Sequence, residues 1–175
     1  DSRLNRCGYL VSDENGGVDL APVDVAVIGS GIAGLFLAVE CARSGLRVAI
    51  VTKKEVSTSS TNWAQGGIAG VLDPDDLDGL ESHVRDTLDA GSGLCDERVV
   101  RSVISEASDR IRDLIGHGVE FDHNSSGEYD MAIEGGHSGA RIFHTRDRTT
   151  AAIERALTEV AAAGSESNPT TLDKW

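Results

Sequence analysis

Hydrophobic and polar positions along the chain predict a mixed α/β fold. The apolar run 23–28 predicts a strand, residues 32–43 a helix, and the nearly continuous apolar run 46–51 a second, buried parallel strand. Strands that alternate with helices in this way form βαβ units. The sequence therefore predicts a Rossmann-like unit between about residues 23 and 52.

Helical periodicity returns in three later segments. Residues 78–90 carry apolar side chains at four-residue spacing, Asp96 is suited to cap a helix that runs to about residue 115, and residues 149–163 form a third helix. The inward faces predicted for these helices comprise Leu80, Val84 and Leu88; Val99, Val100, Val103, Ile104, Ala107, Ile111, Leu114 and Ile115; and Ile153, Ala156, Leu157 and Val160.

Short strands are expected between the last two helices, and polar segments at both ends. Residues 119–121 predict a short strand, and the alternation of Tyr129, Met131 and Ile133 predicts an edge strand. Residues 1–22 have the composition of a polar tail or linker, and residues 165–175 carry no strand pattern, although a βαβ arrangement requires a strand after the last helix. Residues 23–164 are therefore expected to form the folded domain.

A glycine motif joins the first predicted strand to the first helix. Gly29, Gly31 and Gly34 have the Gly-x-Gly-x-x-Gly spacing that allows a tight turn, close approach of the backbone to a pyrophosphate, and close packing of the helix on the strand. The amide groups of the helix start then face the phosphates. The motif alone is a weak signal, but its place between strand and helix favours a dinucleotide site.

The end of the second strand does not decide which nucleotide binds. An acidic residue there usually binds a ribose hydroxyl, but this strand ends in Thr52-Lys53-Lys54, with Glu55 as the nearest carboxylate. A basic residue is compatible with the 2′-phosphate of NADP, and FAD with a neutral or basic strand end is the alternative.

Residues 53–73 are too rich in hydroxyl groups and glycine for a helix. The segment contains Ser57-Thr58-Ser59-Ser60-Thr61 and Gln65-Gly66-Gly67, interleaved with apolar Trp63, Ile68 and Val71. Backbone donors in such a loop could surround a polar ligand, whereas a simple surface linker would not carry these apolar residues.

Composition narrows the class of partner. The 175 residues carry a formal net charge of −13, which disfavours a nucleic acid or an anionic membrane as partner. Cys7, Cys41 and Cys95 show no metal-ligand spacing, and an unpatterned odd number suits a reducing compartment. We therefore expect a cytoplasmic protein without a metal site, a secretory leader or a membrane span.

Residues 59–70 have the sequence Ser-Ser-Thr-Asn-Trp-Ala-Gln-Gly-Gly-Ile-Ala-Gly. This segment resembles the flavin loop of the succinate dehydrogenase/fumarate reductase flavoprotein superfamily and, within it, that of the L-aspartate oxidases. Further similar segments follow in the same order at 82–88, 90–96, 118–122, 134–138 and 141–144, so the resemblance covers about residues 24–160. It implies a Rossmann-like FAD-binding fold of the glutathione reductase type, present only in its N-terminal part.

The resemblance also implies where the cofactor binds. The first turn would line the FAD pyrophosphate, Lys53 would lie near the adenosine end, and the loop would follow the ribityl chain and the flavin. These cofactor-binding residues are Gly29, Ser30, Gly31, Ile32, Ala33, Gly34, Lys53, Ser60, Thr61, Asn62, Trp63, Ala64, Gln65, Gly66 and Gly67. Quinone-linked relatives attach the flavin to a loop histidine, where this chain has Ser60, so FAD is expected to be non-covalent.

Substrate contacts are implied around residue 134. Glu134 matches a glutamate that orients the substrate, and a carboxylate can accept hydrogen bonds from an α-amino group. His137 and His144 could contact substrate or flavin. Arg141 could bind a substrate carboxylate, or it could pair with Asp147 or Glu134 as part of the scaffold. His83 and His117 are given no role.

The implied reaction is the FAD-dependent oxidation of L-aspartate to iminoaspartate, with oxygen or fumarate as electron acceptor and quinolinate synthase as a further partner in NAD biosynthesis. Members of the resembling family are much longer, and the catalytic base is expected outside this chain, so we expect a truncated enzyme. The segment Asp147-Arg148-Thr149-Thr150 also departs from the Thr-Gly that the family usually has at the start of this helix. Two alternatives remain: a soluble fumarate reductase-like flavoprotein, and a catalytically inactive FAD-binding fragment.

Overall fold

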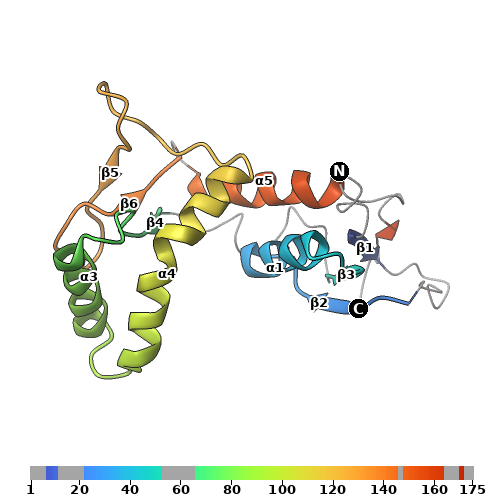
Figure 1. The fold of residues 1–175 in the computed structure, drawn as a ribbon, viewed down its shortest axis with the longest axis horizontal. Coiled ribbons are helices and arrows are strands. Elements are labelled where there is room, and N and C mark those ends of the chain that lie inside the picture. The colour runs from blue at the N-terminus through green and yellow to red at the C-terminus, as the bar shows by residue number, and fades with distance from the viewer. Residues whose placement is uncertain (1–6, 12–21, 53–65, 146–147, 164–169, 172–175) are drawn as a thin grey trace. The chain divides into compact units, whose positions relative to one another are not determined.

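The structure is a computed structural model, which describes residues 7–11, 22–52, 66–145, 148–163 and 170–171. The described residues belong to two compact units, Asp1–Ala64 with Thr150–Trp175 and Gln65–Thr149. The elements in chain order are β1 (Cys7–Val11), β2 (Val25–Ile28), α1 (Ile32–Arg43), β3 (Val48–Val51), β4 (Ile68–Ala69), α3 (Leu77–Ala90), α4 (Glu97–Gly116), β5 (Met131–Ala132), β6 (Ile142–Phe143), α5 (Thr149–Ala163) and β7 (Thr170–Thr171) (Figure 1).

The first unit contains the predicted βαβ element. β2 and β3 are parallel neighbours, with Val25 opposite Val48 and Ile28 opposite Val51, and α1 packs against both strands. The helix buries Leu35, Ala38, Val39 and Ala42, one face at helical spacing, and β3 buries its first three residues. The prediction of helix 32–43 is confirmed to the residue, and both strands are confirmed with later starts.

The sheet of this unit extends beyond the prediction, in the order β2-β3-β1-β7 with parallel pairing throughout. β1 and β7 lie in segments that were predicted to be polar and without strands, so this part of the prediction is wrong. The reason is tertiary. The edge of β3 presents backbone N–H and C=O groups that require partners, and a short extended segment from elsewhere in the chain can supply them.

The second unit combines a helix pair with a small antiparallel sheet. Asp96 caps α4, as predicted, by accepting a hydrogen bond from the Arg98 amide at 2.9 Å. Asp76, which was not predicted as a cap, caps α3 by accepting from the Gly79 amide at 2.9 Å. The sheet has the order β4-β6-β5. Phe143 on its central strand is fully buried, and its ring contacts the rings of Phe121 and Tyr129 at centroid distances of 5.5 Å.

The strand predicted at 119–121 is not formed, although Val119 and Phe121 are both buried. The backbone here is used to end α4, because the Val119 amide donates to the Leu114 carbonyl at 3.1 Å. The strand expected around Met131 is present as β5, and β4 lies within the segment that was predicted to be a loop.

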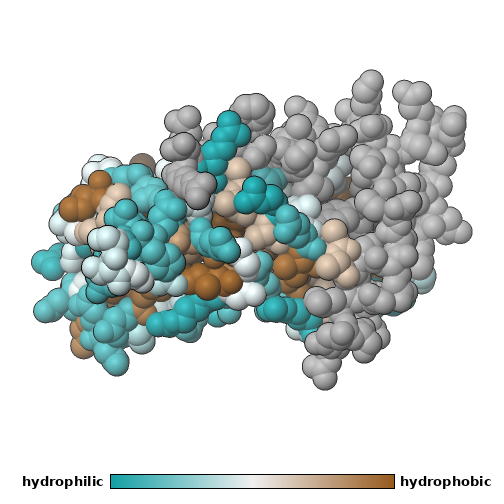
Figure 2. Space-filling view, turned by 90° about the horizontal axis from the view of Figure 1, so that it is seen from above, coloured by the Kyte–Doolittle hydropathy of each residue, from teal (hydrophilic) through white to brown (hydrophobic). Residues whose placement is uncertain are grey.

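Two predicted core positions of α4 are exposed. Val99 and Val103 have exposed fractions of 58% and 64%, whereas Ile104, Ile111 and Leu114 are buried. Val99 and Val103 are one turn apart, on a row beside the buried stripe, so the apolar surface of α4 is wider than the face that packs. Figure 2 shows hydrophobic surface between hydrophilic residues on one side of the molecule.

Candidate functional site

The turn between β2 and α1 has the geometry that the glycine motif predicts. Gly29 has a φ of +108°, a conformation that residues with a side chain rarely adopt, and its amide donates to the Val51 carbonyl at 2.8 Å. A Cβ at Gly34 would overlap the Gly29 carbonyl oxygen and lie 3.3 Å from Val27 Cγ1. Glycine at position 34 therefore allows the helix to pack directly on the turn.

The start of α1 is suited to an anion. Gly31 is its N-cap residue and supplies no side-chain cap, and the first turn contains no acidic side chain. Ser30 is buried, and its hydroxyl lies 2.9 Å from the hydroxyl of Thr52 at the end of β3. A tight glycine turn followed by a helix start without a side-chain cap fits the pyrophosphate of a dinucleotide. Lys53 and the expected flavin-loop residues 60–65 lie outside the described residues.

The end of the expected flavin loop is described, and it packs against β6. Gly66 has a φ of +110°. A Cβ at Gly67 would overlap the Phe143 carbonyl oxygen and Ile142 Cγ2, and it would lie 3.0 Å from His144 Cε1. Only a residue without a side chain fits between this loop and β6, so both glycines are required by the backbone and its surroundings.

Glu134 lies against the same glycine pair. The chain turns at Gly135, whose φ is +57°, and the His137 amide donates to the Glu134 carbonyl at 3.2 Å. One carboxylate oxygen of Glu134, Oε1, lies 3.3 Å from Nε2 of His144, and the other, Oε2, lies 3.5 Å from the position that a Cβ of Gly66 would take. The fold thus brings a half-exposed carboxylate to the loop that was expected to follow the flavin.

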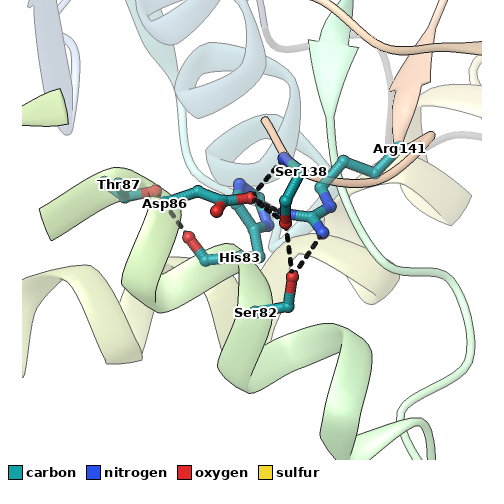
Figure 3. Close-up of polar contacts among 6 residues, drawn as sticks. All are labelled: Ser82, His83, Asp86, Thr87, Ser138 and Arg141. Atoms are coloured by element: carbon teal, nitrogen blue, oxygen red, sulfur yellow. Dashed lines mark hydrogen bonds and ion pairs between the residues drawn. The ribbon is translucent and has the colours of Figure 1, made fainter. Parts of the chain in front are cut away.

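Arg141 is held in a buried polar cluster with α3 (Figure 3). Its side chain is 6% exposed, and it donates through Nη1 to Asp86 Oδ2 at 2.8 Å and through Nη2 to Ser82 Oγ at 2.9 Å. Asp86 Oδ2 also accepts from the amide and the hydroxyl of Ser138 at 2.7 and 2.8 Å. The Ser138 amide and hydroxyl, followed by the Arg141 guanidinium, hold the pKa of Asp86 below its ordinary value.

Two imidazole rings lie beside this cluster. His83 and His137 meet edge to face with ring centroids 5.2 Å apart, and the Nδ1 atom of each is buried without a hydrogen-bond partner in the described part of the chain. Burial, with the nearby positive charge of Arg141, lowers the pKa of His83 from 6.5 to about 4. His83 is therefore neutral at physiological pH.

The structure brings only some of the expected site residues together. Glu134 meets the Gly66–Gly67 segment, but Arg141 pairs with Asp86 rather than with Glu134, and Asp147 lies outside the described residues. Ser82, His83, Asp86 and Ser138 were not proposed as site residues. Their signals were the four-residue spacing of Ser82 and Asp86 on one helix face, and Ser138 directly after a predicted candidate. Their partners in the loop 56 and 52 residues away could not be predicted from that spacing.

The described residues contain neither a candidate membrane-spanning helix nor a candidate metal site. No helix there is both long and apolar enough to cross a membrane. Within the same part of the chain, no three or more histidine, cysteine, aspartate or glutamate side chains converge in a way that could hold a metal ion.

Comparison with known sequences matches most of the chain to one family of FAD-binding proteins. The FAD binding domain family matches residues 24–174. The chain is 54% identical over 136 residues to an L-aspartate oxidase of Arabidopsis thaliana, an alignment that covers 78% of this chain and 20% of that protein. It is 50% identical over 141 residues to an L-aspartate oxidase of Pseudomonas aeruginosa, covering 77% and 26%. The chain thus spans about a fifth to a quarter of the length of these relatives.

Solved structures with the same fold include an Sdh1 complex and a quinol fumarate reductase. The Mycobacterium smegmatis Sdh1 complex in its apo form matches with a TM-score of 0.73 and 35% identity, over 79% of this chain and 23% of the matched chain. An E. coli quinol fumarate reductase matches with a TM-score of 0.73 and 26% identity, over 81% and 24%. The α/β fold predicted from the resemblance, a partial FAD-binding fold, is confirmed.

Proposed function

This chain belongs to the FAD binding domain family, and from that premise we propose that it is the flavin-binding portion of an L-aspartate oxidase. The cofactor of the family is FAD. The reaction proposed is oxidation of L-aspartate to iminoaspartate. The observation that carries this proposal is the position of the Glu134 carboxylate, 3.5 Å from the Cβ position of Gly66 in the loop expected to follow the flavin.

The residues of the first unit would hold the adenine dinucleotide end of FAD. The turn at Gly29 and Gly34 and the uncapped start of α1 would accept the pyrophosphate, with Ser30, Gly31, Ile32 and Ala33 along it. We propose that Lys53 and residues 60–67 continue this site. Because Ser60 stands where quinone-linked relatives carry the attaching histidine, the cofactor is proposed to be non-covalent.

The residues of the second unit would orient the substrate. FAD bound in this family's site would supply the acceptor for a hydride from the substrate α-carbon. Glu134 would accept hydrogen bonds from the α-ammonium group, an interaction that succinate cannot make because it lacks nitrogen. Two Arg141 nitrogens donate to Asp86 and Ser82 of α3, which supports a scaffold role for Arg141 over a direct contact with a substrate carboxylate. His137 stays a candidate for contact with substrate or flavin.

The electron acceptor, the enzyme that uses the product and the cellular location are part of the same proposal. We propose that oxygen or fumarate reoxidises the flavin and that a quinolinate synthase consumes the iminoaspartate. A cytoplasmic location is proposed as well, although several similar plant proteins carry the description chloroplastic.

Anaerobic flavin reduction tests the function. The complete gene product that carries this sequence should lose its yellow absorbance when L-aspartate is added, and acid precipitation should release the flavin into the supernatant. Reduction by succinate alone would favour the fumarate reductase-like alternative, which the similarity to the Sdh1 complex supports. A flavin that stays oxidised with both substrates would refute the proposed oxidation.

Glu134→Gln separates the two enzyme classes. This variant keeps the size of the side chain but removes its charge, so it should reduce kcat/KM for L-aspartate far more than for fumarate. Equal effects on both substrates would contradict recognition of the amino group by Glu134.

A further inference from the structure

Sheet register fixes His144 beside the loop glycines. In the antiparallel pair of β4 and β6, Ile68 lies opposite Phe143, so the next positions outward are Gly67 and His144. The Cβ position of Gly67 is only 3.0 Å from His144 Cε1. The His144 carbonyl also accepts the Asp122 amide at 2.8 Å. The Asp122 amide thus holds the backbone of His144, and its imidazole lies against Gly67.

The imidazole is directed to one oxygen of Glu134. The His144 side chain is 20% exposed and the Glu134 side chain 46% exposed, and Nε2 lies 3.3 Å from Oε1. Nε2 is buried, and this contact has the distance of an ion pair without the alignment of a hydrogen bond. The opposite oxygen, Oε2, is the one that lies near Gly66. The two oxygens therefore have different surroundings, one beside a fixed ring and the other beside the flavin loop.

Among the described residues, the Glu134 side chain has no ion pair other than the one with His144. Glu134 precedes Gly135 and Gly136, and a long, half-exposed carboxylate side chain next to glycines can populate several rotamers. A side chain that must meet an ammonium group at one place gains from a partner that restricts its rotamers.

We propose that His144 is a positioning residue, which holds Oε1 of Glu134 so that Oε2 faces the substrate α-ammonium group. This inference rests on the proposed function, because it assigns the amino-group contact of that reaction. His144 does not touch the substrate in this arrangement. Its effect is therefore confined to substrates with an amino group, and it requires the charged carboxylate of Glu134.

Two replacements of His144 separate positioning from general damage. In His144→Gln the side-chain amide nitrogen can reach the place of Nε2, whereas in His144→Asn it reaches only the place of Nδ1. His123→Asn is the matched control, because His123 is an exposed histidine of the same unit. The FAD content of each purified protein reports whether the fold is intact.

The test measures anaerobic flavin reduction by L-aspartate, and reoxidation by fumarate, in the complete gene product. His144→Asn should lower kcat/KM for L-aspartate about tenfold, while His144→Gln stays within about threefold of the parent, as expected for a group that orients a ligand. Reoxidation by fumarate and the activity of His123→Asn should stay within about twofold of the parent. In a Glu134→Gln background, adding His144→Asn should cause no further loss.

Three results would overturn the inference. The first is a normal kcat/KM for His144→Asn. The second is a loss that adds in full to that of Glu134→Gln, which would indicate independent roles. The third is an equal loss with fumarate, which would indicate structural damage. A parent protein that L-aspartate does not reduce would refute the proposed function and this inference together, so the two failures are distinguishable.

Discussion

Acidification should destabilise this protein through His83. The ring lies on α3, and its burial, followed by the nearby Arg141 guanidinium and the His137 ring, lowers its pKa from 6.5 to about 4. In the unfolded chain the same side chain titrates near its ordinary value. Between these two values the unfolded state binds a proton that the folded state does not, so stability falls as the pH decreases through this window.

The size of the effect follows from the two pKa values. Each unit of difference corresponds to about 1.4 kcal/mol, so lowering the pH from about 7.5 to about 4.5 should remove between about 2 and 3 kcal/mol of folding free energy through His83 alone. Below about pH 4 the folded state also binds the proton, and this contribution to the slope ends.

Urea unfolding of the parent chain and of His83→Asn at a series of pH values measures this contribution. The variant is expected to be less stable near neutral pH, because it loses packing, but its stability should decrease less steeply with falling pH. The other titrating groups are shared by both proteins, so the difference between the two slopes isolates His83. Parallel slopes across the whole window would refute the conclusion that burial keeps this imidazole neutral.

Further substitutions test the packing and the cluster. Gly34→Ala should lower the unfolding free energy by about 1–3 kcal/mol and weaken FAD binding in a fluorescence titration, because its Cβ would overlap the preceding turn; unchanged FAD affinity would contradict this. Gly67→Ala should destabilise the chain to urea by a similar amount of about 1–3 kcal/mol, whereas Gly116→Ala, with open space around its Cβ position, should be neutral or stabilising by up to about 1 kcal/mol. Asp86→Asn should remove part of the stability loss that the parent shows between about pH 5 and pH 3. The Ser138 hydrogen bonds lower the pKa of the native Asp86 carboxyl, so they stabilise the fold while that carboxyl is charged. If the melting temperature of the variant changes with pH as that of the parent does, Asp86 does not have this role.

The helices could be predicted from the sequence because their signals are local. α1 begins and ends where the periodicity and the glycine residues predicted, and Asp96 caps α4 through an amide two residues away. The error at Val99 and Val103 has a physical cause, since periodicity shows which residues share a face but not how wide the packed surface is.

The strands β1 and β7 could not be predicted from their own residues. Both were assigned to polar ends, and their pairing depends on a neighbouring strand edge distant in sequence. The same limit applies to the strand expected at 119–121, where the competing use of the backbone was the end of α4.

The sequence by itself determined the βαβ unit, the glycine turn that fits a pyrophosphate, and the residue types available for a substrate site. The tertiary structure alone decided which of those residues meet. It pairs Arg141 with Asp86, 55 residues away, and it brings Glu134 and His144 to the Gly66–Gly67 backbone through the pairing of β6 with both β4 and β5. Contacts of this kind depend on how separate segments pair and pack, and no local spacing encodes the distance between two side chains that meet only after folding.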